Sequence, residues 1–254
     1  AEMERLQRHP VEPERDVLLF LMENAPLTRW QRNIIEMIRA EAYYFAPQRC
    51  TKIMNEGWAS FWHTNIMTRS GILDDSEVID YADRHSGTVV AHRGKINPYR
   101  LGLELFRDIF DRWNTGKFGR DYNDCDDMAA RESWNTNAGL GKEKVFEVRK
   151  HHNDLTFLDE FLTPEFCAKQ KLFTFENNPR ARAWQIASLD FKKVKQKLLG
   201  QLTNMGQPLI EVLDAKFEGR EELLLIHRFD NVELDDQYTE PTLKNLYKIW
   251  KRPV

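Results

Sequence analysis

The chain has 254 residues, which is enough for one large domain or two domains of ordinary size. Its apolar fraction of 41% and charged fraction of 30% are typical of a folded soluble protein and exclude a chain that is disordered throughout. The formal net charge of −3 argues against a dedicated nucleic-acid-binding protein, because phosphate binding needs a net basic face, and no apolar stretch approaches the ~18 residues of a membrane span.

The N-terminus and the cysteines indicate the cellular compartment of the protein. The N-terminus is charged and lacks the apolar core of a secretion signal. Cys50, Cys125 and Cys167 are far apart and odd in number, so they fit free thiols in a reducing compartment better than disulfides or a zinc cluster. We therefore expect a cytoplasmic protein. The polar start and the abrupt end at Val254 suggest a fragment of a longer protein.

The first part of the chain is predicted to be helical. A linker at 1–14 precedes a helical domain at 15–170. Thr28 can cap a helix with an apolar stripe, and Pro47 is expected to interrupt the chain before another helix at 49–69. The stripe of the first of these helices consists of Trp30, Ile34, Ile35, Ile38 and Ala42. Its tryptophan is expected in the core.

The rest of the helical domain contains a long interruption. A helix is predicted from Asp74 or Asp75, and the Asn97-Pro98 pair predicts a further helix start, because asparagine caps and proline suits the first helical position. Residues 115–141 are rich in Gly, Asp and Asn and predict a mobile loop, since loops of this length are usually functional or mobile. Helix returns at 142–170.

From residue 171 the period of the apolar residues changes from helical to alternating. The expected elements are strands at 172–175 and 182–186, a helix at 190–203, a hairpin of 209–215 with 223–229, and a final helix from Thr239. The sequence therefore predicts an α+β protein, with a mostly helical N-terminal portion followed at 171–254 by a small α+β domain with a short antiparallel sheet.

The segment from Thr51 to His63, TKIMNEGWASFWH, carries the main candidate site. Glu56 and His63 lie seven residues apart, close to two helical turns, so both side chains leave from one face of the predicted helix. The intervening residues are small or aromatic. Burying a carboxylate and an imidazole there is costly unless a metal, a polar partner or a substrate satisfies them.

A structural interpretation competes with a functional one. A glutamate and a histidine two turns apart often belong to a polar network between helices, and Asn55 could extend such a network.

Two other groups of possible metal ligands are poor candidates. Adjacent histidines 151 and 152 point about 100° apart and cannot easily share an ion. The acidic residues between 121 and 127 lack the spacing of a calcium loop.

Several phrases, taken in order, resemble one family, the stage V sporulation protein R (SpoVR) family. They are ERDVLLFLMENAP, WQRNIIEMIRAEAYYFAPQR, TKIMNEGWASFWH, INPYRLGLELFRDI, FLTPEFCAKQKLF, LLLIHRF and LKNLYKIWKRPV. The resemblance covers nearly the whole chain. It implies a bacterial, cytoplasmic protein that influences spore cortex or peptidoglycan assembly. It also implies a longer parent, with an N-terminal half that this chain lacks.

The resemblance suggests a metal-dependent hydrolase. The segment 56–59 looks like the helix that supplies the third zinc ligand in gluzincin peptidases, whose other ligands are two histidines of an earlier helix. Glu56 would then be a zinc ligand, and His63 a further ligand or a group that orients the site. The remaining ligands would come from the missing N-terminal half.

Other residues are assigned catalytic roles on the same hypothesis. Tyr43 or Tyr44 could donate a hydrogen bond to an oxyanion. His85 and His92 could contact substrate or a tetrahedral intermediate, and Tyr99 could face the Glu56 helix. The family's biology implies peptidoglycan or a peptidoglycan precursor as substrate, or else a protein partner.

The alternative is a non-catalytic interaction or scaffold protein. In that case the helical part is a rigid platform and the C-terminal α+β domain binds a partner. The predicted strand 223–229, LLLIHRF, is apolar and could lie at a sheet edge open to pairing. Metal content distinguishes the two classes, because only the hydrolase should bind zinc through Glu56 and His63.

Overall fold

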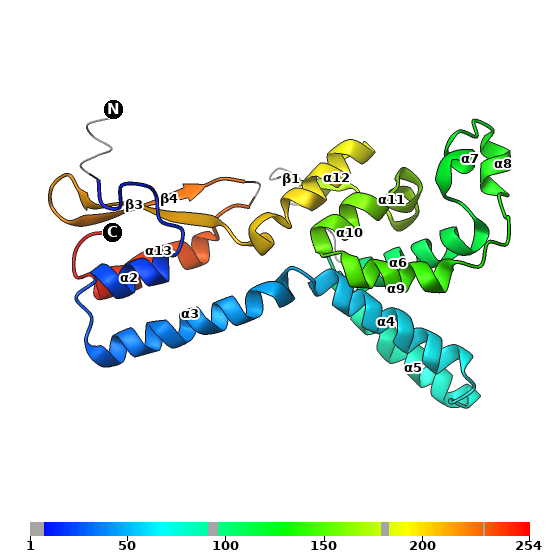
Figure 1. Cartoon of the computed structure of the whole chain (residues 1–254), viewed down its shortest axis with the longest axis horizontal. Coiled ribbons are helices and arrows are strands. Elements are labelled where there is room, and N and C mark those ends of the chain that lie inside the picture. Colours follow the sequence, from blue (N-terminus) through cyan, green and yellow to red (C-terminus); the bar gives the residue numbers. More distant parts are fainter. Residues whose placement is uncertain (1–7, 91–95, 179–182, 231) are drawn as a thin grey trace. The chain divides into compact units, whose positions relative to one another are not determined.

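The computed structural model describes residues 8–90, 96–178, 183–230 and 232–254 (Figure 1). The chain forms two compact units, one of residues 1–49 with 200–254 and the other of residues 50–199. The first unit is therefore built from both ends of the chain. The predicted boundary at residue 171 lies inside the second unit, and residues 15–49 group with the C-terminal elements rather than with the other helices.

The first unit is a β-hairpin with helices packed on it. Its elements are α2 (Val17–Asn24), α3 (Arg29–Arg49), η1 (Thr203–Gly206), β3 (Leu209–Phe217), β4 (Glu222–Arg228) and α13 (Asp236–Trp250). The antiparallel pair β3–β4 joins α2 and α13 around one apolar core, which includes Phe20, Leu21, Val212, Leu223 and Trp250 (Figure 1). These residues come from both ends of the sequence, so neither end can form this core alone.

The segment expected to be a linker runs along β3. The backbone N–H of Glu14 donates to the Val212 carbonyl at 3.0 Å, and the Val212 N–H donates back at 2.8 Å. The Ala215 N–H donates to the His9 carbonyl at 2.6 Å. At the other edge of the hairpin, the Leu223 N–H donates to the carbonyl of Pro253 at 2.9 Å. Part of the 223–229 edge that we expected to be open is thus paired within the chain.

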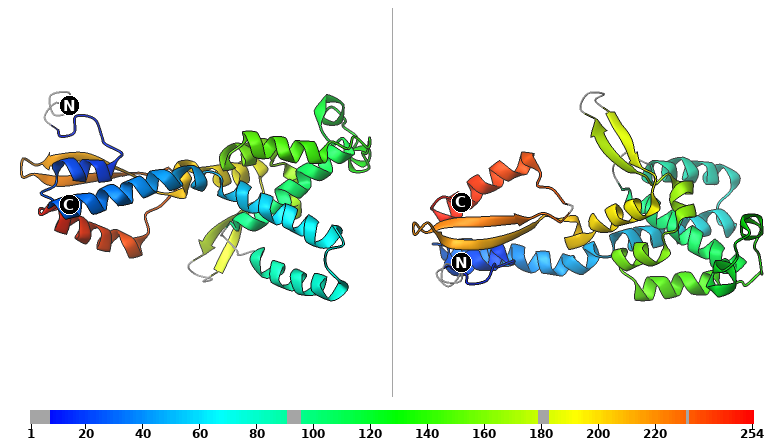
Figure 2. Two further views of the ribbon diagram at one scale, coloured as in Figure 1. Left: turned by 60° about the horizontal axis from the view of Figure 1, so that its bottom comes forward. Right: turned by 90° about the horizontal axis from the view of Figure 1, so that it is seen from above.

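The second unit is helical with a small hairpin. Figure 2 shows β1 and β2 projecting from the helices of this unit. Its elements are α4 (Lys52–Arg69), α5 (Asp75–Thr88), α6 (Pro98–Thr115), α7 (Gly119–Asn123), α8 (Met128–Glu132), α9 (Gly141–His151), α10 (Asp154–Phe161), α11 (Pro164–Gln170), β1 (Thr174–Asn178), β2 (Ala183–Ser188) and α12 (Phe191–Gly200). The predicted α+β class is confirmed, with mostly helix and two small antiparallel sheets.

The centre of this unit is α6. Its fully buried side chains include Leu105, Phe106 and Ile109, and they meet Val145 of α9 and Phe157 of α10, which are also fully buried. Phe106 stacks at a tilt on Phe157, with ring centroids 4.9 Å apart. The Asn97 side chain caps α6 by accepting from the N–H groups of its first turn, as the Asn-Pro pair predicts.

Helices α4 and α6 cross in backbone contact. A Cβ atom placed on Gly57 would lie 2.4 Å from backbone atoms of Gly102, and one placed on Gly102 would lie 2.2 Å from the Ile53 carbonyl oxygen. Any side chain at either position would therefore force the helices apart. This close approach brings the start of α6 beside the Glu56 turn of α4.

The N-terminus of α4 is held by a residue about one hundred positions away. The Asp154 carboxylate accepts from the backbone N–H groups of Ile53 and Met54, each at 2.8 Å, and the Asp154 N–H donates to the Cys50 carbonyl. Asp154 is only 3% exposed, and burial raises the pKa of its carboxyl while these N–H groups oppose that rise. Nothing near residue 52 in the sequence signals this cap.

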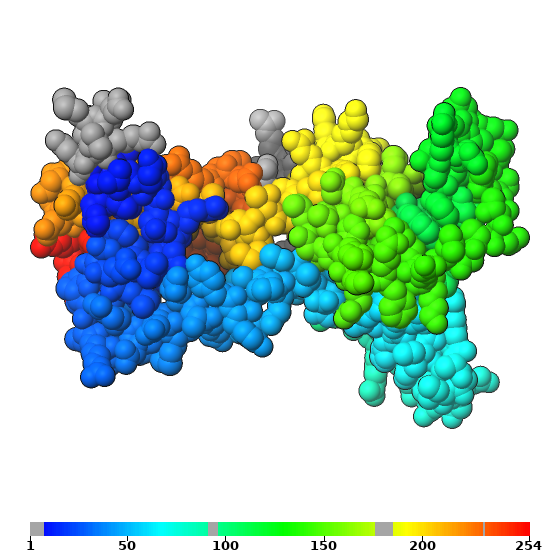
Figure 3. Space-filling view, viewed as in Figure 1, coloured from blue at the N-terminus to red at the C-terminus, as the bar shows by residue number. Residues whose placement is uncertain are grey.

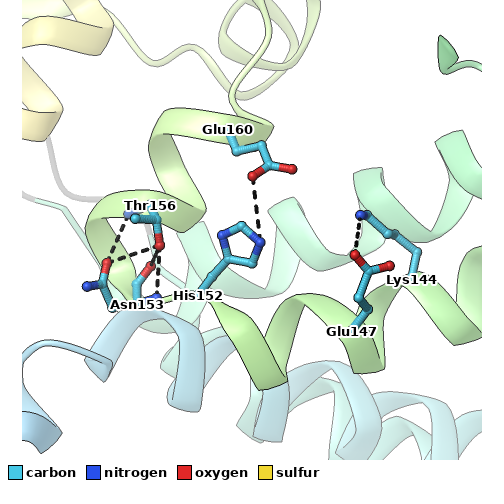
Figure 4. A network of polar contacts seen from close by, with 6 residues as sticks. All are labelled: Lys144, Glu147, His152, Asn153, Thr156 and Glu160. Carbon is cyan, nitrogen blue, oxygen red and sulfur yellow. Dashed lines mark hydrogen bonds and ion pairs between the residues drawn. The ribbon is translucent and has the colours of Figure 1, made fainter.

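The turn between α9 and α10 is a second polar junction (Figure 4). The Asn153 side chain accepts from the Thr156 N–H, and the Thr156 hydroxyl accepts from the Asn153 N–H, both at 3.0 Å. His152 Nε2 lies 3.7 Å from a Glu160 carboxylate oxygen, and its ring meets Phe161 edge-on. His152 therefore connects the end of α9 to the last turn of α10.

Several local expectations need correction. α3 continues through Pro47 to Arg49, because the proline lies in the last turn and disturbs few hydrogen bonds beyond it. Trp30, expected in the core, is 63% exposed. The segment 115–141 is not a plain loop, since it contains α7 and α8 and stands out from the body of its unit (Figure 3). Within it, Tyr122 meets Trp134 edge-on, with ring centroids 5.6 Å apart.

Candidate functional site

Glu56 lies on α4, half-buried, next to the point where this helix crosses α6. The hydroxyl of Tyr99, in the first turn of α6, is close enough to the Glu56 carboxylate for hydrogen bonding to it and for its charge to raise the pKa of Tyr99. The Asn97 cap fixes the turn that carries Tyr99, because Asn97 Oδ1 accepts from the Tyr99 N–H at 3.0 Å. Tyr99 thus lies near Glu56, and its catalytic role stays a prediction.

His63 lies two turns further along α4 and faces a different helix. It is exposed, and its ring meets the ring of Tyr81 of α5 edge-on, with centroids 5.1 Å apart and planes at 88°. Tyr81 in turn stacks on His85 at 5.3 Å and 21°. The structure thus brings His63 and His85 to two sides of one tyrosine, whereas Glu56 pairs with α6.

A hydroxyl group of α4 also contacts the cluster formed by His63, Tyr81 and His85. Thr64 Oγ1 lies 3.0 Å from the Tyr81 hydroxyl and 3.5 Å from His85 Nε2. Burial lowers the pKa of His85, and the nearby charges of Arg107 and His63 lower it further. Both effects favour the uncharged form of the His85 imidazole.

The aromatic residues of the motif lie on the core side of α4. Trp58 and Trp62 pack on Phe146 of α9, with ring centroids 4.9 and 5.6 Å away, and Phe61 lies 6.2 Å from Phe106. The prediction that Trp58 and Trp62 serve packing fits these contacts. They hold α4 against α6 and α9, which fixes the direction of the polar side chains.

Tyr43 and Tyr44 lie on α3, in the other unit. The Tyr43 hydroxyl donates to Asp16 Oδ2 at 2.8 Å, and Arg39 also binds that carboxylate, at 2.7 Å. Tyr44 is exposed and meets Phe45 edge-on. Neither tyrosine belongs to the cluster on α4, α5 and α6, and their proposed contact with an oxyanion stays a prediction. His92 lies outside the described residues.

The described residues do not by themselves form a metal centre. Among them, no group of three or more His, Cys, Asp and Glu side chains is arranged to hold an ion. Glu56 and His63 face different helices, and seven residues of helix separate their α-carbons by about 10 Å. A zinc ion could take Glu56 as one oxygen ligand, but it would need ligands from outside these residues.

The comparisons with known proteins identify the family. Residues 1–207 match the family described as SpoVR like protein, and residues 208–254 match the SpoVR-like C-terminal domain. The chain belongs to the SpoVR family. It is 28% identical over 261 aligned residues to the Escherichia coli (strain K12) protein named "Uncharacterized protein YcgB". No solved structure matches the chain.

The match also shows how much of the relative is represented. The aligned region covers 96% of this chain but 49% of YcgB, so the chain spans about half the length of that relative. Within the described ranges, no helix has the length and apolarity needed to cross a membrane.

Sequence reasoning missed Thr64, Tyr81 and Arg107. Tyr81 could have been found, because it lies four residues before His85 and so shares its helix face. Thr64 and Arg107 carried no signal of their own, since their relevance depends on how α4, α5 and α6 pack.

Proposed function

We propose that this chain supplies part of the active site of a cytoplasmic, metal-dependent hydrolase that acts on peptidoglycan or a peptidoglycan precursor. Through this reaction it would influence spore cortex or cell-wall assembly. The observation that supports the proposal best is Glu56, a half-buried carboxylate next to the crossing of α4 and α6, with Tyr99 close by. His63 and His85 lie two turns further along, at the junction with α5.

Each group has a separate task in this proposal. Glu56 is one metal ligand, and Tyr99 fixes the orientation of its carboxylate. When bound, zinc would supply a water of lowered pKa and polarise the amide carbonyl of the substrate. His85 accepts a proton, and His63 either contributes a further ligand or orients the site. The other ligands come from outside this chain.

Metal analysis of the protein at its full natural length tests the proposal. We expect close to one equivalent of zinc in the wild type, and loss of most of it in Glu56→Gln and His63→Ala. His151→Ala is the matched control, because His151 is an exposed histidine at the end of α9 and should leave zinc unchanged. A metal-free wild type would overturn the proposal, and a fold preserved in both variants would then favour the scaffold alternative.

A further inference from the structure

Helix α3 has an apolar face that the described chain leaves exposed. Successive residues of an α-helix turn by about 100°, so six exposed large side chains of α3 fall within an arc of about 120°. Their exposed fractions run from 40% to 69%. We call this set the α3 stripe, and it consists of Trp30, Ile34, Met37, Ile38, Tyr44 and Phe45.

The α3 stripe is not the side through which α3 is attached to its unit. α3 packs on α2 (Figure 1), and on that opposite side Ile35 is buried while Arg39 and Tyr43 bind Asp16. A helix with apolar side chains on two opposite sides is usually covered on both. Contiguous exposed apolar patches on folded proteins commonly mark sites of interaction.

Glu41 defines the chemistry of the surface that would fit the α3 stripe. Between Trp30 and Phe45 it is the single charged residue within the arc. Covering a carboxylate is costly unless a partner group satisfies it. The matching surface is therefore apolar, with a lysine or arginine opposite Glu41.

The size of the α3 stripe favours an occupant from the same polypeptide. Six side chains along one helix are far fewer than the ~20–30 residues that each side of a stable interface between separate proteins contributes. A tethered segment needs less contact, because tethering raises its effective concentration. The chain spans about half the length of YcgB, so a family member of that length has about as much chain outside this region as within it.

We propose that the α3 stripe is the docking surface for an amphipathic helix from the part of the full-length protein that lies outside this chain. A helix is the fitting partner, since apolar residues three and four positions apart form ridges that pack into the grooves of another helix. The inference does not depend on the proposed metal site, because Glu56, His63 and His85 lie on other helices.

Hydroxyl-radical footprinting of the protein at its full natural length tests whether the stripe is covered. Met37, 63% exposed in this chain, is compared with Met128 of α8, which is 81% exposed. We expect Met37 to be oxidised several-fold more slowly than Met128. Trp30→Lys places a charge in the stripe and should return Met37 to a rate close to that of Met128. Ala40→Lys is the matched control and should leave Met37 shielded, since Ala40 is an exposed residue of α3 outside the arc.

Photocrosslinking identifies the occupant. With the photoreactive analogue benzoylphenylalanine in place of Met37, we expect a crosslink within a single polypeptide to a peptide from outside these 254 residues. A crosslink to a second copy, at twice the mass, would overturn the inference, and so would a crosslink to another part of these residues. Equal oxidation of Met37 and Met128 in the wild type would also overturn it, and that comparison requires no variant to fold.

Discussion

Helices α3 and α6 have similar apolar spacing but opposite surroundings. On α6, six of 18 residues are buried, and Phe106 is fully inaccessible. On α3, Ile35 is the single buried residue among 21, while Trp30 and Met37 are each 63% exposed. The spacing of apolar residues thus predicts a helix and its stripe, whereas the neighbouring elements decide whether the stripe is covered.

The difference matters for function because Glu56 and Tyr99 of the candidate site lie on helices with buried faces, whereas α5, which carries His85, has no buried residue. Glu56, Tyr99 and His85 project from α4, α6 and α5, and the first two of these helices are in backbone contact. A well-packed scaffold holds catalytic groups within the small tolerance that chemistry needs. On α3, by comparison, Arg39 and Tyr43 bind Asp16 at the junction with α2.

The largest expected effect on stability comes from removing a core side chain of α6. Phe106→Ala should lower the free energy of unfolding by about 3–5 kcal/mol, since it removes a fully buried ring and leaves a cavity. Trp30→Ala on α3 should change it by less than about 0.5 kcal/mol, because that side chain is exposed. Urea unfolding followed by circular dichroism measures both. Equal losses in the two variants would contradict the comparison.

The buried cap of α4 should give the next largest effect. Asp154→Ala leaves the N–H groups of Ile53 and Met54 without acceptors and should cost about 2–3 kcal/mol. Asp154→Asn keeps one acceptor oxygen and should cost less. The same unfolding experiment orders the three proteins. An alanine variant as stable as wild type would show that this carboxylate does not anchor the motif helix.

The close crossing of α4 and α6 predicts a cost of about 1–3 kcal/mol for Gly102→Ala, because the new methyl group would overlap the Ile53 carbonyl. Gly87→Ala on α5 is the matched control, since a Cβ there meets nothing within 4 Å. This control should be neutral or slightly stabilising. A harmless Gly102→Ala would mean that the two helices do not need to touch.

The smallest effect on stability is expected at Asp16, which binds Arg39 and Tyr43 of α3. Burial raises the pKa of Asp16, but hydrogen bonds from Arg39, the Leu19 N–H and Tyr43 outweigh it, and the net pKa lies below the usual 3.8. A lowered carboxyl pKa adds stability above the unfolded value, and this is lost as pH falls through the folded value. Asp16→Asn should remove that acid dependence, worth less than about 1 kcal/mol. Unfolding curves between pH 5 and 2 measure it, and an unchanged pH dependence in the variant would contradict the assignment.

How far the sequence could predict the structure depended on the range of the interactions. The Asn97-Pro98 helix start and the hairpin of β3 and β4 follow from local rules and are confirmed. The Asp154 cap joins residues a hundred positions apart. The expected burial of Trp30 required a neighbouring element to cover it, and Trp30 is exposed instead. No local pattern contains that information.

The candidate site followed the same division. The helix face of Glu56 and the helix start before Tyr99 are local signals, whereas the nearness of these two residues depends on how α4 crosses α6. Separating Glu56 from His63 required knowing that α5 covers one turn of α4 and α6 another. Thr64 could not be found at all, since its relevance arises from its contacts with Tyr81 and His85 of α5.

Hydrolysis of peptidoglycan amides by the zinc-loaded protein at its full natural length tests the central claim most directly. We predict that the wild type and His151→Ala release new amino groups, that Glu56→Gln falls to background, and that Tyr99→Phe keeps its fold but binds zinc 10–100-fold more weakly. Undiminished hydrolysis by a folded Glu56→Gln protein would contradict the account, and so would a wild type that binds zinc but releases nothing.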